Sequence, residues 1–156
     1  LLDVINQLKS QRFIVKIAGE GPEFKVFNHA IQERGLEDKI ELLGNISNVA
    51  DYMHEADIFA MTSSWEGLPI SLIEATLSGL PCIVTDVGGC GEVISDCKNG
   101  FVIKSSYAHD YAIKLDALLD SFELRKELSK NALHLSKPYT IDSAVVKHIE
   151  LYGLIL

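Results

Sequence analysis

Two carboxylates near the middle of the chain have the residue type and spacing to bind a polyhydroxylated ligand. Glu66 and Glu74 are separated by seven residues. An ionised carboxylate offers only hydrogen-bond acceptors, and it pairs well with a diol. If the first lies in a turn and the second just inside a helix, both side chains can face one pocket.

The segments around these carboxylates predict a strand, a turn and a helix. Residues 58–61 form an apolar run that is typical of a short buried strand. A turn through Ser63, Ser64 and Gly67 follows, and Pro69 suits the first turn of a helix. This arrangement puts polar groups at the carboxyl edge of a sheet, where open α/β folds bind ligands. The N–H groups at a helix start also favour an anion such as a phosphate.

Each of these residues also has a purely structural interpretation. Ser71 and Glu74 fit a capping box, in which the Glu74 side chain would bond back to the backbone of Ser71. Glu66 fits a solvated turn carboxylate, and Trp65 fits a packing aromatic better than a platform for a sugar ring. Taken alone, Glu66 and Glu74 do not decide between a structural role and a ligand-binding role.

The rest of the chain alternates between strand and helix patterns. A chain of 156 residues is sufficient for one domain with a core. We expect strands at 12–18, 39–43, 56–61, 81–85 and 100–103, and helices at 1–8, 22–34, 48–55, 69–78, 107–119, 123–135 and 141–152. Gly35 and Gly79 are expected to end the second and fourth helices. The alternation predicts an α/β fold with a parallel sheet and helices on both of its faces.

Three further loops have small or polar residues that suit a ligand. Gly19-Glu20-Gly21 begins like a dinucleotide fingerprint, but its third glycine would fall at Phe24, which argues against a NAD-type dehydrogenase. Asn45 is either a ligand contact or the cap of the helix at 48–55. Residues 88–91 are small and permit a close approach of backbone, and Glu92 suits the first turn of the next helix.

Composition and charge exclude several classes of protein. The net charge of −8 argues against binding to nucleic acid through the whole surface. No run of 18 apolar residues predicts a membrane span. The three cysteines and five histidines lack the spacing of a metal site or a disulfide framework, and reduced thiols indicate a cytoplasmic protein. The chain opens within a helical pattern, as a piece of a longer protein would.

The segment from Ser63 to Ala75 resembles the signature of the retaining, nucleotide-sugar-dependent glycosyltransferases of family four. Six flanking segments agree in order and spacing: 17–22, 41–44, 56–58, 79–84, 88–92 and 99–102. The match extends over about residues 13–103, with a weaker helical tail. Members of that family have the two-domain GT-B architecture, and this signature belongs to their second, donor-binding domain.

The resemblance implies the domain organisation. Residues 1–156 would form a single nucleotide-sugar-binding domain with a Rossmann-like parallel sheet, the second half of a GT-B fold. The first strand of that domain, an arginine and a lysine that grip the diphosphate, and the N-terminal acceptor domain would precede Leu1. The isolated chain would then lack turnover.

The resemblance also assigns roles at the site. Glu66 would be the catalytic carboxylate, which positions the donor sugar, and Glu74 would bind the ribose hydroxyls. The loop and helix start would bind the diphosphate, through Gly67, Leu68, Ile70 and Ser71. Gly19 and Gly21 would lie beside the phosphates, and Asn45 would meet the base. Pro69 departs from the glycine that many members have, and it cannot donate a hydrogen bond.

The implied reaction is retaining transfer of a sugar from a nucleotide diphosphate without a metal ion or cofactor. The acceptor would be a glycan or a lipid-linked glycan in cell-envelope or capsular polysaccharide synthesis. The enzyme would be cytoplasmic, with an association of its full-length form with the inner face of the membrane as one option. Two alternatives remain: a non-catalytic nucleotide-sugar-binding module, and another GT-B enzyme such as a nucleotide-sugar epimerase.

Overall fold

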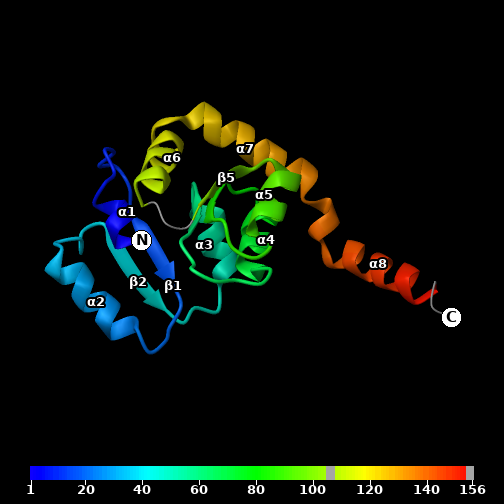
Figure 1. Ribbon diagram of the computed structural model, residues 1–156, viewed down its shortest axis with the longest axis horizontal. Helices are drawn as coiled ribbons and strands as arrows, with labels where there is room; N and C mark the ends of the chain where they lie inside the picture. Colours follow the sequence, from blue (N-terminus) through cyan, green and yellow to red (C-terminus); the bar gives the residue numbers. More distant parts are fainter. Residues whose placement is uncertain (105–107, 154–156) are drawn as a thin grey trace.

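The computed structural model describes residues 1–104 and 108–153, and it confirms the predicted alternation of strands and helices (Figure 1). In chain order the elements are α1 (Leu2–Ile5), β1 (Val15–Ala18), α2 (Phe24–Glu33), β2 (Ile40–Gly44), α3 (Val49–Glu55), β3 (Phe59–Met61), α4 (Ile70–Leu77), β4 (Cys82–Thr85), α5 (Cys90–Cys97), β5 (Gly100–Ile103), α6 (Ala108–Asp120), α7 (Phe122–Leu135), the 3-10 turn η1 (Lys137–Tyr139) and α8 (Ile141–Gly153). Tyr107, expected to begin a helix, lies outside the described residues.

All the strand pairs are parallel, but the strands form two sheets rather than the single sheet expected. One sheet has the order β1-β2 and the other the order β3-β4-β5. Within the described residues, β1 and β3 each pair with one strand only. The separation of the sheets therefore leaves one edge of β1 and one edge of β3 without a partner strand.

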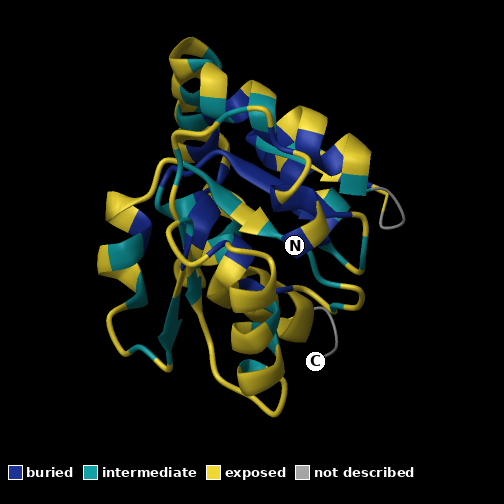
Figure 2. Cartoon of the chain, turned by 90° about the vertical axis from the view of Figure 1, so that its left-hand side faces the viewer, coloured by how far each residue is buried: buried dark blue, intermediate teal, exposed yellow. Residues whose placement is uncertain are grey.

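Helices pack on both faces of the three-stranded sheet. Ile83 of β4 points into a core that contains Tyr111 and Leu118 of α6, whereas Val84 points to the opposite face and packs with Leu72 of α4. All these side chains are 2% exposed or less. Figure 2 shows the buried residues between the strands and the helices, with exposed residues on the outer faces of the helices. Burial of each large apolar side chain stabilises the fold by about 1.5–3 kcal/mol.

Two glycines end helices as the sequence predicts. Gly35 has a φ of +63° and Gly79 a φ of +80°, both in the left-handed region. After α2, the Leu36 N–H donates to the Ile31 carbonyl, and after α4 the Leu80 N–H donates to the Ala75 carbonyl. This six-to-one bond satisfies a terminal carbonyl and turns the chain sharply into the next strand.

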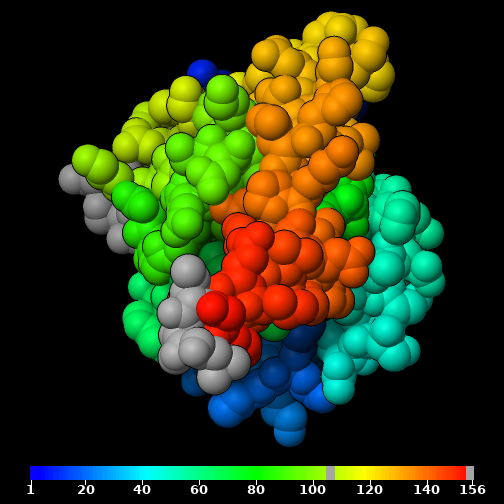
Figure 3. Space-filling model, turned by 90° about the vertical axis from the view of Figure 1, so that its right-hand side faces the viewer, coloured from blue at the N-terminus to red at the C-terminus, as the bar shows by residue number. Residues whose placement is uncertain are grey.

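The last helix, α8, projects away from the strands and their covering helices in Figure 1, and it lies at the front of the molecule in Figure 3. None of its described residues is buried, and Ile149 and Leu151 are 65% and 54% exposed. Residues 154–156 lie outside the described part. No helix in the described residues is both long and apolar enough to cross a membrane.

Candidate functional site

The loop between β3 and α4 holds Glu66 in a defined position. Glu66 is half-buried, and its Oε1 accepts a hydrogen bond of 2.7 Å from the hydroxyl of Ser63. The carbonyl of Ser63 in turn accepts a 2.6 Å hydrogen bond from the hydroxyl of Thr85, the last residue of β4. Glu66 is therefore only partly solvated, and a local hydrogen bond restricts its orientation in the turn.

The glycine pair before α5 approaches this same loop closely. The N–H of Gly89 donates to the carbonyl of Gly67 at 2.6 Å. A Cβ atom on Gly88 would clash with the carbonyl oxygens of Glu66 and Gly67, and the φ of Gly88 is +51°. The close approach predicted for residues 88–91 therefore occurs, and its partner is the Glu66 loop. Glu92 lies in the first turn of α5, as predicted.

The start of α4 corrects two predictions from the sequence. Pro69 is the N-cap, with a φ of −71° and a ψ of 120°, rather than a residue of the first turn. Its carbonyl accepts the N–H groups of Leu72 and Ile73. Ser71 therefore lies inside the helix and makes no capping bond, so the capping box of Ser71 and Glu74 is wrong. The physical reason is that the helix begins two residues earlier than that box requires.

Backbone donors without acceptors gather at this helix start. Within residues 1–104 and 108–153, no hydrogen bond engages the N–H groups of Gly67, Leu68, Ile70 or Ser71. The first N–H groups of a helix have no intrahelical acceptor, and the partial positive charge of the helix end adds to their attraction for an anion. The loop and the first turn of α4 therefore form an anion-binding surface.

Glu74 lies one turn further along α4. It is exposed, and Ile70 and Ser71, four and three residues before it, are exposed as well. Residues at these spacings share a helix face. In the described part of the chain the Glu74 carboxylate makes no hydrogen bond or ion pair, so its oxygens are free to accept bonds from a ligand.

The side chain of Trp65 does not pack into the core as the sequence had suggested. Its side chain is 85% exposed, and it does not belong to any core cluster of the described residues. The prediction that it packs into the interior is wrong. Leu68 and Ile70, which are 52% and 70% exposed, place further apolar surface along the same loop and helix start.

The two remaining predicted loops lie together after β1 and β2. The N–H of Gly19 donates to the carbonyl of Gly44 at 2.8 Å, which brings the Gly19–Gly21 turn beside Asn45. Asn45 is exposed and does not cap α3, because Asn48 occupies the N-cap position. The predicted capping role of Asn45 is therefore wrong, whereas Gly19, Gly21 and Asn45 do lie at carboxyl ends of parallel strands.

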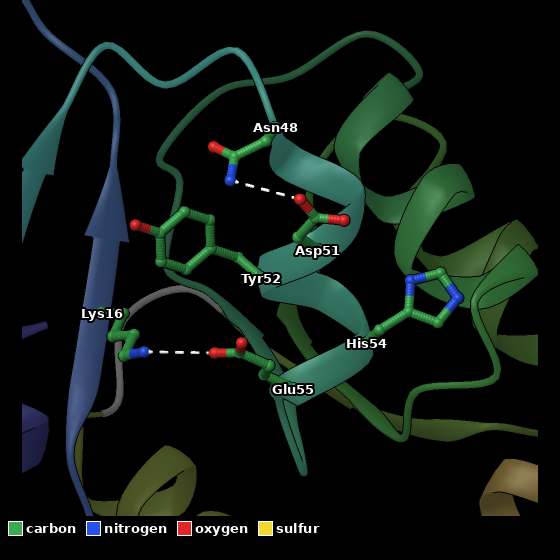
Figure 4. Close-up of a pocket in the computed structure, with 6 residues that line it drawn as sticks. All are labelled: Lys16, Asn48, Asp51, Tyr52, His54 and Glu55. Carbon is green, nitrogen blue, oxygen red and sulfur yellow. Dashed lines mark hydrogen bonds and ion pairs between the residues drawn. The ribbon is translucent and has the colours of Figure 1, made fainter.

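A separate cavity of about 470 Å³ lies between β1 and α3 (Figure 4). It is lined by Lys16, Asn48, Asp51, Tyr52, His54 and Glu55. Lys16 and Glu55 extend toward each other across it, with 3.6 Å between their charged atoms. Five of its residues lie on or just before α3, but sequence reasoning missed the cavity, because only the tertiary structure brings Lys16 of β1 beside them. It contains none of the predicted site residues.

The thiol of Cys90 lies close to Glu66 but is chemically quiet. Burial raises its pKa, and the negative charge of Glu66 raises it further. Cys90 is fully buried, so the thiol stays protonated and inert at neutral pH. Among the described residues, no three His, Cys, Asp or Glu side chains gather into a group that could hold a metal ion.

Comparisons with known proteins agree with the resemblance. The family model for glycosyl transferases group 1 matches residues 1–134. The chain is 32% identical over 117 residues, 75% of its length, to the N,N'-diacetylbacillosaminyl-diphospho-undecaprenol alpha-1,3-N-acetylgalactosaminyltransferase of Campylobacter jejuni. It is 31% identical over 135 residues, 86% of its length, to the O-antigen biosynthesis glycosyltransferase WbnH of Escherichia coli.

A solved structure has the same fold. A mutant of TarM from S. aureus, in complex with fondaparinux, alpha-GlcNAc-glycerol and UDP, matches 96% of this chain with a TM-score of 0.85 and 26% identity. The chain spans 31% and 37% of the two curated relatives and 30% of the TarM chain, about a third of their lengths. The expected α/β fold, with parallel strands and helices on both faces, is thereby confirmed, and the chain belongs to the glycosyl transferases group 1 family.

Proposed function

We propose that this chain is the donor-binding domain of a retaining glycosyltransferase and that it binds a nucleotide-diphosphate sugar. The observation that carries the proposal is the start of α4. There, backbone N–H groups that have no acceptor among the described residues lie between Glu66, which is hydrogen-bonded, and Glu74, whose carboxylate has no partner in that same part of the chain. Family membership and the UDP in the TarM complex support it.

Each part of the donor has a partner in this arrangement. The diphosphate binds the N–H groups of Gly67, Leu68, Ile70 and Ser71, because a helix N-terminus favours an anion. Glu74 accepts hydrogen bonds from the ribose hydroxyls, and Glu66 accepts them from the sugar. Gly19 and Gly21 lie beside the phosphates, and Asn45 meets the base.

The reaction follows from this placement. An acceptor hydroxyl attacks the anomeric carbon, the bond from that carbon to the diphosphate oxygen breaks, and the leaving diphosphate takes the acceptor proton. The sugar is transferred with retention, without a metal ion or cofactor. Holding both reactants in attack geometry and stabilising the charge that develops on the diphosphate supply most of the rate. Glu66 positions the sugar rather than attacking it.

The unpaired edges of β1 and β3 support the proposed domain organisation. We infer that a strand upstream of Leu1 fills the space between the two sheets, and that an N-terminal domain binds a glycan or lipid-linked acceptor. The names of the relatives support a role in polysaccharide synthesis. We place the enzyme in the cytoplasm, because its three cysteines are free thiols. The chain alone is then expected to bind donor weakly and to show no turnover.

Calorimetric titration of the chain with UDP, GDP, ADP and their glucose or mannose sugars tests this proposal. We expect one nucleotide to bind, and Glu74→Gln to weaken its binding by about 1.5–3 kcal/mol, the range for a hydrogen bond to a charged group. Glu55→Gln, in the separate cavity, is the matched control and leaves the affinity unchanged. If none of the nucleotides or their sugars binds, even at millimolar concentration, the proposal is overturned. Donor binding by a longer enzyme that has no turnover would instead indicate a non-catalytic module.

A further inference from the structure

The hydrogen bond from Ser63 to Glu66 gives Ser63 a role that the sequence motif did not assign. We propose that Ser63 is a positioning residue, which holds the Glu66 carboxylate in the orientation that receives the donor sugar, and that Thr85 fixes Ser63. This inference rests on the proposed function, because it concerns the sugar end of the same donor site.

The contact has the geometry of a strong hydrogen bond. The Ser63 hydroxyl donates to Glu66 Oε1 at 2.7 Å, between two half-buried side chains three residues apart. Hydrogen bonds from a hydroxyl to an ionised carboxylate are short and about twice as strong as neutral ones. The bond engages one carboxylate oxygen and restricts a side chain that has several rotatable bonds. The second oxygen, Oε2, stays available to the ligand.

The backbone that carries Ser63 is itself held from the neighbouring strand. Thr85 is 6% exposed, and its hydroxyl donates to the Ser63 carbonyl at 2.6 Å. On the other side of Glu66, the N–H of Gly89 donates to the carbonyl of Gly67. The end of β4 and the start of α5 therefore fix the loop on both sides of Glu66. Loss of a partner from a buried polar pair leaves an unsatisfied group, which is costly.

The adjacent serine shows that this arrangement is specific to Ser63. Ser64 is exposed, and it makes no hydrogen bond within the described residues. A serine with only a turn-forming role bonds to nearby backbone groups, whereas the Ser63 hydroxyl donates to a side chain of the candidate site. Ser64→Ala is therefore a matched control.

The test compares a nucleotide with its sugar in calorimetric titrations of the 156-residue chain. The probes are UDP with UDP-glucose and GDP with GDP-mannose, and the variants are Ser63→Ala, Ser63→Thr and Ser64→Ala. We expect the wild-type chain to bind the nucleotide sugar more tightly than the nucleotide. Ser63→Ala should weaken the nucleotide sugar about tenfold, the loss of one charge-assisted hydrogen bond, and should change the affinity for the nucleotide very little. Ser63→Thr keeps a hydroxyl and should retain the wild-type difference, and Ser64→Ala should match the wild-type chain.

Thr85 and Glu66 supply a second measurement that separates positioning from folding. Thr85→Val, which keeps the shape but removes the hydroxyl, should lower the sugar affinity in the same selective way, and Thr85→Ser should restore it. In a double-mutant cycle, Glu66→Gln should weaken nucleotide-sugar binding much less in a Ser63→Ala background than in the wild-type chain, because the two residues act as one unit. Equal melting temperatures of the serine variants exclude unfolding as the cause.

The outcomes distinguish the inference from the function on which it rests. Equal weakening of nucleotide and nucleotide sugar by Ser63→Ala would indicate a general structural role and overturn the inference. An unchanged sugar affinity, or a wild-type chain that gains nothing from the sugar, would overturn it as well. In each of these cases nucleotide binding persists, so the nucleotide site of the proposed function stands. Failure of every probe to bind would reject both.

Discussion

Glu66 and Glu74 have the same functional group but different surroundings, and the difference suits different tasks. Glu66 is half-buried and hydrogen-bonded to Ser63, so its orientation is restricted before any ligand arrives. Glu74 is exposed on a helix, and its carboxylate makes no hydrogen bond or ion pair in the described residues. A fixed carboxylate suits the reacting sugar, where geometry sets the rate, and a mobile one is sufficient to bind the ribose.

At the scale of single residues, a substitution of Gly88 tests the contact that holds the Glu66 loop. We expect Gly88→Ala to lower the free energy of unfolding by about 1–3 kcal/mol, the cost of a strained backbone position. The added methyl group would clash with the carbonyls of Glu66 and Gly67, and the φ of +51° at this position is unfavourable for alanine. Chemical denaturation measures the effect. Gly21→Ala is the control, because nothing lies within 4 Å of its added Cβ; equal effects of the two changes would contradict the contact.

The buried thiol of Cys82 predicts a loss of stability at alkaline pH. Burial raises its pKa from 9.0 to about 12 in the folded chain. Between these values the unfolded chain releases the proton and the folded chain keeps it, so the stabilisation is complete below about pH 9 and is lost as the pH rises toward about 12. Urea unfolding at a series of pH values across this range should show the decline.

A comparison with Cys82→Ala isolates the contribution of this thiol. The variant should decline less steeply above about pH 9, by about 1.4 kcal/mol per pH unit, the value for one proton. Burial also raises the pKa of Cys90, Cys97 and Tyr111, so a smaller decline remains in the variant. Parallel curves for the two proteins would rule out the proposed origin of the effect.

The sequence predicts which residues gather at the site better than it predicts their local roles. The residues from Glu66 to Glu74 are close in the chain, so a strand, a turn and a helix suffice to bring them together. The capping-box prediction is wrong because the pattern of Ser71 and Glu74 does not determine where the helix starts. Only the structure shows that Pro69 is the N-cap. The Ser63 bond could have been suspected from its spacing of three residues to Glu66, but the support from Thr85 depends on tertiary contact.

At the scale of the elements, hydrophobic patterns and glycines predict the order of strands and helices correctly. Strand ends are less well predicted: β1 begins at Val15 rather than at Arg12, because hydrogen bonds to a neighbouring strand, not apolar residues alone, define a strand. The division into two sheets is not visible in the local pattern. Strand pairing depends on contacts far apart in sequence, which residue spacing does not report.

Hydrogen exchange tests the proposed position of the upstream strand. The Val15 and Phe59 N–H groups donate to neighbouring strands, and N–H groups alternate in direction along a strand, so those of Lys16 and Ala60 face the unpaired edges. In this chain we expect both amides to exchange quickly, whereas that of Val84, in the central strand, is protected. In a longer protein that includes the preceding segment, Lys16 and Ala60 should become protected. Unchanged exchange there would contradict the placement of that strand.

At the scale of the whole molecule, α8 adds little to the stability of the rest of the chain. None of its described residues is buried, and the hydrogen bonds of Ser143 join it only to Lys137 and Thr140 within the described part. We expect a chain that ends at Thr140 to lose less than about 1 kcal/mol of unfolding free energy, as for surface changes in general. Thermal unfolding measures this. A loss of several kcal/mol would show that α8 packs on the domain in solution.

The net charge of −8 makes the helix start at Ile70 more important for function. An acidic chain repels an anionic donor at long range, so local donors must outweigh the overall charge. Backbone N–H groups do this without a charged side chain. The net negative charge also argues against nucleic acid as a partner.

The most direct test of this account measures how Glu66 and Glu74 divide the donor between them. Calorimetric titrations of Glu66→Gln and Glu74→Gln should use the nucleotide that binds the wild-type chain, alone and as its sugar. We predict that Glu74→Gln weakens both ligands alike, whereas Glu66→Gln removes only the additional affinity that the sugar provides. If both variants bind both ligands as tightly as the wild-type chain does, the two carboxylates do not form the donor site.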